Sequence, residues 1–171
     1  MKQLTVIIPT HNPRIEPLDE VLKALHAQTL QPKYWELLII DNASIQPVRE
    51  YLVQWHPQGR VLREPQLGLT HARLRGLNES NIELLVWVDD DNILNPNYLK
   101  QALQLFQRCP SLGAAGGASI PEFEEPPPAW YEPGLAPIGC RELGDEEIWM
   151  RWDVDQLAYP ARVSSGLSIP T

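Results

Sequence analysis

The feature that most constrains this 171-residue chain is a series of short apolar runs, each of which stops at a polar cluster. Leu4–Ile8, Leu37–Ile40 and Leu84–Val88 are nearly continuous in Leu, Ile and Val. Runs of this length and composition are typical of strands that are buried on both faces of a parallel sheet. A shorter run follows at Val61-Leu62, and a run rich in small residues covers Gly113–Ser119. We expect a strand at each of these five positions.

Segments with helical periodicity lie between the apolar runs. The clearest apolar stripe covers residues 18–25, and shorter stripes cover residues 48–55 and 72–77. Asn95 as N-cap and Pro96 as the first helical residue predict a further helix. Strands that alternate with helices predict an α/β fold with an open, mostly parallel, Rossmann-like sheet and helices on both faces.

The charge and the proline content of the chain change after Ile120. Residues 1–120 carry 11 basic and 12 acidic side chains, whereas residues 121–171 carry 3 basic and 10 acidic ones together with 8 of the 17 prolines. Such a composition does not favour a second compact domain. We therefore expect an α/β body over residues 1–120 and an irregular, Pro-rich, acidic C-terminal segment over residues 121–171.

Composition excludes several classes of protein. The net charge of -8 argues against a nucleic-acid partner, because phosphate binding needs a basic surface. No apolar run approaches the ~18–20 residues of a membrane span, and Met1–Thr5 leads directly into a predicted strand, which leaves no room for a signal peptide. Cys109 and Cys140 form neither a disulfide framework nor a zinc motif, so we expect a cytoplasmic location.

Three polar clusters directly follow three of the predicted strands. They are Pro9–Asn12, Asp41–Ser44 and Asp89–Asn92. In open α/β sheets, ligands bind beyond the carboxyl ends of the strands. The sequence therefore predicts that the three clusters converge at one edge of the sheet and form the functional site.

The cluster Asp89-Asp90-Asp91 contains three consecutive carboxylates, which repel one another unless a counter-charge is present. A hard divalent cation supplies such a charge, and Mg²⁺ or Mn²⁺ is commonly held by one or two carboxylates together with a diphosphate. The alternative is a solvated acidic turn that caps the next helix. The position after a buried strand favours the metal interpretation.

The other clusters contain candidate ligand-binding residues. Asp41 could accept hydrogen bonds from a nucleobase or a ribose, or it could instead form a turn that caps the following segment. Thr10 and His11 could contact the same groups. Arg73 lies in the segment Gly68–Arg73, which opens a predicted helix, and could bind a phosphate or could pair with a surface carboxylate.

Four motifs together resemble the family 2 glycosyltransferases of the GT-A fold. The motifs are Val6–Asn12, Leu38–Ser44, Gly68–Arg73 and Val86–Asn92, and their order and spacing match the family as well. The resemblance covers residues 3 to 120 and extends more loosely into the Pro-rich stretch that follows.

The resemblance implies a nucleotide-diphosphate-sugar donor, with UDP favoured, that binds across the edge of the sheet. The residues that it implies for donor binding are Pro9, Thr10, His11, Asp41, Arg73, Asp89 and Asp90. It also implies that Asp91 coordinates Mg²⁺ or Mn²⁺, which stabilises the departing diphosphate. Transfer is expected to be inverting, with a carboxylate that takes the proton of an acceptor hydroxyl.

The resemblance is incomplete at the C-terminal end. Members of the family usually continue with a segment that carries the catalytic base, whereas this chain stops at Thr171. We therefore interpret residues 121–171 as the start of an incomplete acceptor-side segment, with Asp145, Glu146 and Glu147 as the remaining candidates for the base. The alternatives are a non-catalytic nucleotide-sugar-binding module or a truncated fragment. Nucleotidyl transfer is less favoured, because a basic loop for a triphosphate is missing.

Overall fold

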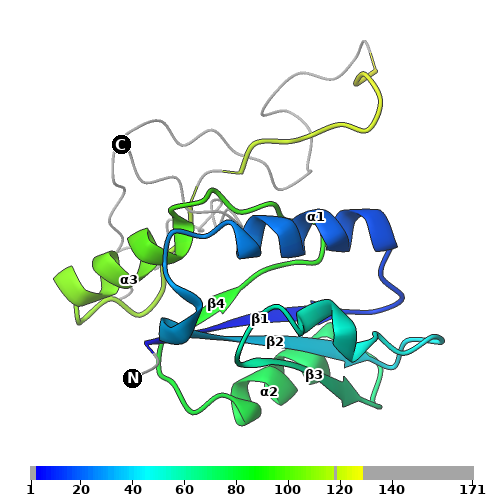
Figure 1. Ribbon diagram of the computed structural model, residues 1–171, viewed down its shortest axis with the longest axis horizontal. Coiled ribbons are helices and arrows are strands. Elements are labelled where there is room, and N and C mark those ends of the chain that lie inside the picture. The colour runs from blue at the N-terminus through cyan, green and yellow to red at the C-terminus, as the bar shows by residue number, and fades with distance from the viewer. Residues whose placement is uncertain (1–2, 118, 129–171) are drawn as a thin grey trace, which may run out of the picture. The chain divides into compact units, whose positions relative to one another are not determined.

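A computed structural model describes residues 3–117 and 119–128 of the chain. The chain divides into two units, Met1–Cys109 and Pro110–Thr171, and each is described by itself. All helices and strands of the described residues lie in the first unit (Figure 1). The expected boundary after Ile120 stays a prediction, because most of the residues beyond it lie outside the described ranges.

A parallel sheet forms the centre of the first unit. In the described residues it contains four strands in the order β3-β2-β1-β4, with every neighbouring pair parallel. The strands are β1 (Leu4–Thr10), β2 (Trp35–Asn42), β3 (Gly59–Glu64) and β4 (Leu85–Trp87). The predicted open α/β architecture is therefore confirmed.

Helices cover both faces of the sheet. Helix α1 (Ile15–His26) lies on one face and α2 (Leu69–Glu79) on the other (Figure 1), and α3 (Tyr98–Arg108) follows β4. Short 3₁₀ turns occupy Pro32–Tyr34 and Glu50–Val53. None of the helices in the described part of the chain is long and apolar enough to cross a bilayer.

The core forms where β1 and β2 pack between the helices, and every residue of both strands is buried, as their apolar composition predicts. On one face, Ile7, Leu38 and Ile40 pack against Ala72 of α2. Helix and sheet approach closely at Gly76, where an added Cβ would lie 2.6 Å from Cγ2 of Ile7. A glycine is thus required by space rather than by backbone conformation.

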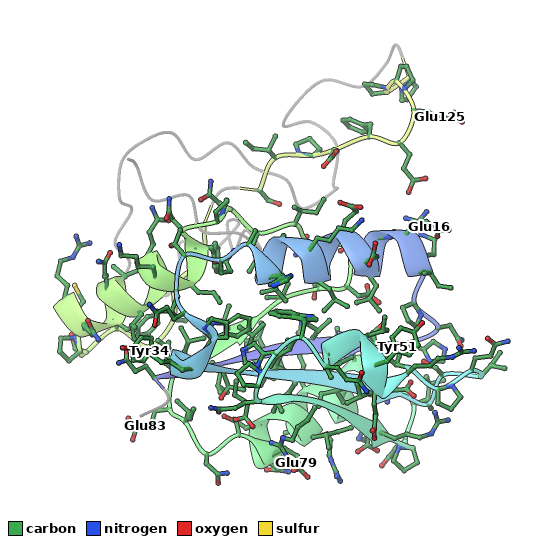
Figure 2. All side chains as sticks on the ribbon, viewed as in Figure 1. Glu16, Tyr34, Tyr51, Glu79, Glu83 and Glu125 are labelled. Carbon is green, nitrogen blue, oxygen red and sulfur yellow. The ribbon has the colours of Figure 1, made fainter. Side chains whose placement is uncertain are left out.

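The strand order determines where a ligand can bind. From β1 the chain proceeds outward through β2 to β3, and α2 then carries it back past β1 to β4. The order reverses between β1 and β4, which in open α/β sheets marks the crevice for a ligand at the carboxyl ends of the strands. Tyr34 and Glu83 lie at the opposite end, where the strands begin (Figure 2).

Two strand predictions are corrected by the structure. We expected Leu84–Val88 to be buried on both faces, but β4 is an edge strand in the described sheet and Trp87 is 38% exposed. The described residues of Gly113–Ser119 form no strand. Their Gly and Ala side chains offer little apolar surface to bury against a sheet, which weakens the tendency to pair.

Two helix predictions are also corrected. The stripe over residues 48–55 forms only a single 3₁₀ turn, because the chain folds back so closely that a Cβ at Gly59 would lie 2.5 Å from the carbonyl oxygen of Val53. The helix expected to start at Asn95-Pro96 begins at Tyr98. Oδ1 of Asn95 accepts the N–H of Asn97 at 3.0 Å and forms a turn before the helix instead of capping it.

The contact at Gly76 gives a prediction about stability. Gly76→Val places a branched side chain against Ile7 and is expected to lower the free energy of unfolding by about 1–3 kcal/mol. Asn78→Val, on the exposed side of the same helix, serves as the control and should change it by no more than about 0.5 kcal/mol. Urea denaturation of both variants measures the difference, and equal effects would contradict the close packing of α2 on the sheet.

Candidate functional site

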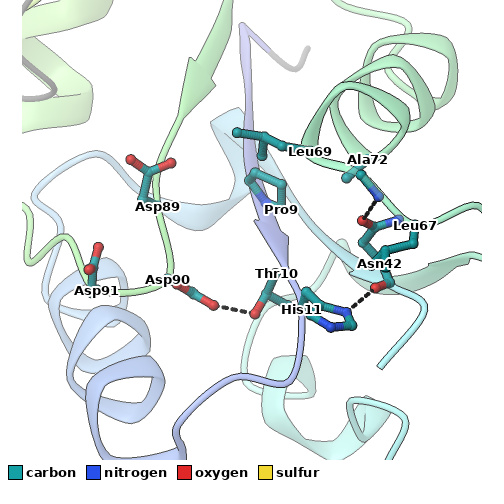
Figure 3. A pocket seen from close by; sticks show the side chains of 11 residues that line it. Pro9, Thr10, His11, Asn42, Leu67, Leu69, Ala72, Asp89, Asp90 and Asp91 are labelled. Atoms are coloured by element: carbon teal, nitrogen blue, oxygen red, sulfur yellow. Dashed lines mark hydrogen bonds between the residues drawn. The ribbon is translucent and has the colours of Figure 1, made fainter. Parts of the chain in front are cut away.

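An open pocket lies at the carboxyl ends of β1, β2 and β4. Its volume is about 480 Å³ (Figure 3). Its lining consists of Pro9, Thr10, His11, Asn42, Leu67, Gly68, Leu69, Ala72, Asp89, Asp90 and Asp91. The predicted convergence is therefore found for the clusters after β1 and β4, which bring together six of the sequence-predicted site residues. The cluster after β2 contributes Asn42 to the lining.

The three aspartates after β4 form the acidic wall of the pocket, and Asp90 points towards Thr10, away from the direction in which Asp89 and Asp91 extend (Figure 3). Oγ1 of Thr10 donates a hydrogen bond to Asp90, and Thr10 is only 4% exposed. Oδ1 of Asp89 lies 4.0 Å from a guanidinium nitrogen of Arg73. Within the described residues, no hydrogen bond or ion pair engages the exposed Asp91. Asp91 thus remains available to a ligand.

The electrostatics of the acidic wall act most strongly on Asp89. Partial burial raises the pKa of its carboxyl above the usual value, the Arg73 guanidinium lowers it, and the charges of Asp91 and Asp90 raise it further. The net direction is upward, with burial as its largest cause, and the three carboxylates of the wall outnumber the Arg73 guanidinium beside them. A cation bound beside this wall would be attracted by that excess charge.

Asn42 and the segment Leu67–Leu69 line the pocket as well, and their side chains carry no charge. Asn42 is 3% exposed, and its Oδ1 accepts the N–H of Gly68 at 2.7 Å. Its Nδ2 donates to the carbonyl oxygens of Gln66 at 2.7 Å and Glu64 at 3.4 Å. The side chain at the end of β2 thereby holds the loop between β3 and α2.

His11 lies beside Asn42, and its neighbours determine which ring nitrogen carries the hydrogen (Figure 3). Nδ1 lies 2.6 Å from the carbonyl oxygen of Asn42, which can only accept. Nε2 lies 2.8 Å from Nδ2 of Asn12, whose Oδ1 is already bound by the N–H of Ile45 at 2.8 Å. We therefore assign the hydrogen to Nδ1, so that Nε2 accepts from the Asn12 amide.

Asp41, predicted to contact a nucleotide, does not line this pocket. Its side chain is buried, with the residue 1% exposed, and its oxygens accept from the N–H groups of Ser44 at 3.1 Å and Val48 at 3.3 Å. Nη1 of Arg63 forms an ion pair with it at 2.8 Å. The turn that the sequence left as an alternative is thus present.

Arg73, the predicted phosphate contact, lies next to the pocket rather than in its lining. Its guanidinium carbon lies 6.0 Å from the centroid of the Trp87 ring, and its carboxylate neighbour is Asp89. The remaining predicted site residues, Asp145, Glu146 and Glu147, lie outside the described residues.

Sequence reasoning missed the contributions of Asn42, Leu67 and Leu69. Asn42 follows a predicted strand and could have been proposed on that ground alone. The two leucines flank Gly68, the residue already selected for close approach of the backbone. Their exposure to the pocket depends on the path of the loop, for which the sequence carries no periodic signal.

Comparisons with known proteins place this geometry in a context. The family model described as glycosyl transferase family 2 matches residues 5–147. The chain is 30% identical over 114 residues to the succinoglycan biosynthesis protein ExoW of Rhizobium meliloti, which covers 63% of the chain and 35% of that protein. It is 27% identical over 125 residues to the uncharacterized glycosyltransferase YwdF of Bacillus subtilis, with 72% and 44% covered.

A more distant relative is the glucosyl-dolichyl phosphate glucuronosyltransferase of Haloferax volcanii, 21% identical over 147 residues, with 83% of the chain and 46% of that protein covered. The chain thus spans less than half the length of each of these three proteins.

Solved structures show the same fold. The structure of S. aureus TarS 1–349 in complex with UDP matches with a TM-score of 0.56 and 22% identity, over 62% of this chain and 32% of that one. The complex of TarS 1–349 with UDP-GlcNAc matches with a TM-score of 0.55 and 22% identity, over 62% and 31%.

The raised pKa of Asp89 gives a prediction about pH and stability. A carboxyl whose pKa is higher in the folded than in the unfolded state costs stability once the pH rises above the unfolded value. Asp89→Asn removes this cost, so its melting temperature at pH 7 should equal or exceed that of the wild type. The difference in melting temperature between the variant and the wild type should shrink as the pH falls through about 4, the ordinary pKa of an aspartic acid. A melting temperature of Asp89→Asn at pH 7 below that of the wild type would contradict the raised pKa of Asp89.

Proposed function

The chain belongs to glycosyl transferase family 2, and from this premise we propose that it binds a nucleotide-diphosphate sugar whose sugar is transferred to an acceptor hydroxyl. The observation that carries the proposal is the pocket at the reversal point of the strand order, which is acidic where it follows β4 and uncharged at Asn42 and Leu67–Leu69. An uncharged wall suits a nucleoside, and an acidic wall suits a diphosphate only if a cation lies between them.

UDP is the favoured nucleotide. Two TarS structures with this fold are complexes with UDP and with UDP-GlcNAc, and we extend the first ligand to this chain as a proposal. The nucleoside would lie near Pro9, Thr10 and His11 at the end of β1, and the diphosphate would extend towards the aspartates. The sugar and the acceptor are left unassigned, and the cytoplasmic location stays a prediction from the cysteine content.

The residues of the acidic wall fit a divalent cation that shares its ligands with a diphosphate. The described residues contain no group of three or more His, Cys, Asp or Glu side chains that could hold a metal by themselves. Mg²⁺ and Mn²⁺ accept one or two carboxylates when phosphate oxygens complete the coordination. Asp91 is the proposed ligand, because Asp90 is bound by Thr10 and Asp89 faces Arg73. When bound, the cation would neutralise charge on the leaving diphosphate.

Two further predicted contacts require a rearrangement of the described side chains. Asp41 could reach a nucleobase or ribose only if its carboxylate exchanged one of its present partners, and Arg63 is the most exposed of them. Arg73 is half-exposed beside Asp89, and a cation at the acidic wall would compete with it for that carboxylate. Its guanidinium could then turn towards the diphosphate.

Inverting transfer is part of the proposal, and we propose that its base lies outside the described residues. The acids that line the pocket all follow β4, where the donor diphosphate would bind. A base must instead contact the acceptor on the opposite side of the sugar, because it removes the proton of the attacking hydroxyl. Asp145, Glu146 and Glu147 stay the first candidates.

Donor binding is tested by calorimetry with UDP and Mn²⁺. We expect binding that weakens in chelator, and we expect Asp91→Asn to weaken UDP affinity in Mn²⁺ by about 10-fold or more, which corresponds to ~1.4 kcal/mol. Glu83→Gln removes the same charge at the amino end of β4 and should bind UDP within about twofold of the wild type (Figure 2). Equal affinity with Mn²⁺ and with chelator would contradict the proposed metal.

Transfer is tested with a labelled UDP-sugar and a panel of hydroxyl acceptors. The acids that line the described pocket all follow β4, where the donor diphosphate would bind, so we expect any turnover near or above ~1 s⁻¹ to require one of the three candidate bases. Asp145→Asn, Glu146→Gln and Glu147→Gln would then identify the base by a loss of about 10²–10⁴-fold. Turnover that none of these substitutions lowers would contradict this assignment.

A further inference from the structure

The side chain of Asn42 directs three hydrogen bonds to one loop. Its amide donates to the carbonyl oxygens of Glu64 and Gln66, and its Oδ1 accepts the N–H of Gly68. These three backbone groups lie along the connection from β3 to α2. Asn42 is buried at 3% exposure, so solvent competes little for these bonds.

The loop that Asn42 holds has a backbone path that only glycine adopts easily. Gly68 has φ +137°, and a Cβ added there would lie 3.3 Å from Cδ2 of His71. Its amide hydrogen is directed to Asn42 in this conformation. The hydrogen bond to Asn42 and the positive φ therefore occur at the same residue, in the loop whose Leu67 and Leu69 line the pocket.

The backbone at Asn42 also contacts His11. The main-chain carbonyl oxygen of Asn42, which Asn42→Ala would leave in place, accepts from Nδ1 of the His11 ring at 2.6 Å. The Asn12 amide bonds to the other ring nitrogen and holds it in turn. One buried residue thus connects two parts of the pocket lining, the His11 ring and the loop at Gly68 (Figure 3).

We propose that Asn42 is a positioning residue for the nucleotide, which acts by holding the Leu67–Leu69 loop and the His11 ring in the orientation that receives the nucleoside. The inference rests on the proposed function, because it assigns the uncharged lining of that same pocket to nucleotide recognition. Asn42 itself need not contact the ligand. Because Asn42 holds the loop in place before the ligand binds, binding does not require a further loss of loop entropy.

The test compares UDP affinity in Mn²⁺ for the wild-type chain and for Asn42→Ala. The variant removes all three side-chain bonds to the loop, and we expect UDP to bind about 10-fold more weakly. Amide hydrogen exchange at Gly68 should become faster in the same variant. Ser80→Ala is the matched control, since it removes a hydrogen bond of 2.8 Å between Thr5 and the opposite end of α2. It should keep its UDP affinity within about twofold even where it is less stable.

A second variant disturbs the same loop from its other side. Gly68→Ala leaves Asn42 intact but disfavours the positive φ, and we again expect UDP to bind about 10-fold more weakly. The double variant should bind UDP with an affinity within about twofold of the lower of the two single-variant affinities. The reason is that both changes disrupt the same loop conformation. If Asn42→Ala does not fold, Gly68→Ala alone still tests the inference, because it must then lower the UDP affinity.

Three results would overturn the inference while leaving the proposed function in place. UDP could bind to Asn42→Ala within about twofold of the wild type, Ser80→Ala could lose as much affinity as Asn42→Ala, or Gly68→Ala could keep its affinity. Failure of the wild-type chain itself to bind UDP in Mn²⁺ would instead contradict the proposed function, and the inference would fall with it.

Discussion

The complete burial of β1 and β2 is the constraint on which the rest of the structure depends. Every residue of the two strands is buried, and helices α1 and α2 cover opposite faces of the sheet. Polar side chains can therefore reach a ligand only beyond the carboxyl ends of these strands. The same packing requires the helix to approach the sheet at Gly76, which fixes α2 and the loop before it. The packing of β1 and β2 between helices α1 and α2 therefore determines both the core and the position of the pocket.

Much of the fold follows from apolar runs and helical periodicity, because burial on both faces leaves a strong signal in the sequence. β1, β2 and the stripe of α1 were predicted for this reason. The wrong predictions concern segments that are only partly buried, or whose ends are determined by local hydrogen bonds. The edge strand β4 has an exposed Trp87, and the start of α3 is displaced by the turn that the Asn95 side chain forms.

The choice between Asp41 and Asn42 shows why part of the site is not predictable from the sequence. Successive side chains of a strand point to opposite faces, so only one of the two can share the face of Leu38 and Ile40, against which α2 packs. Asn42 shares it and bonds to the loop before α2, whereas Asp41 faces the other way and binds Arg63. The face that a helix covers is a property of the tertiary fold, and no residue pattern at these two positions reveals it.

The structure also changes the interpretation of the acidic triplet, which lies beyond the end of β4. As a sequence, Asp89-Asp90-Asp91 suggests three carboxylates that share one cation. In the structure, Asp90 instead accepts a hydrogen bond from Thr10 of β1, and Asp89 faces Arg73 of α2. Each of these two carboxylates connects the segment after β4 to a neighbouring element, and the part of the chain that the structure describes contains no cluster of three or more acidic, His or Cys side chains that could hold a metal by itself. Under the proposed function, a cation would therefore bind firmly only together with a diphosphate, and the acidic wall would respond to the complete donor rather than to the metal alone.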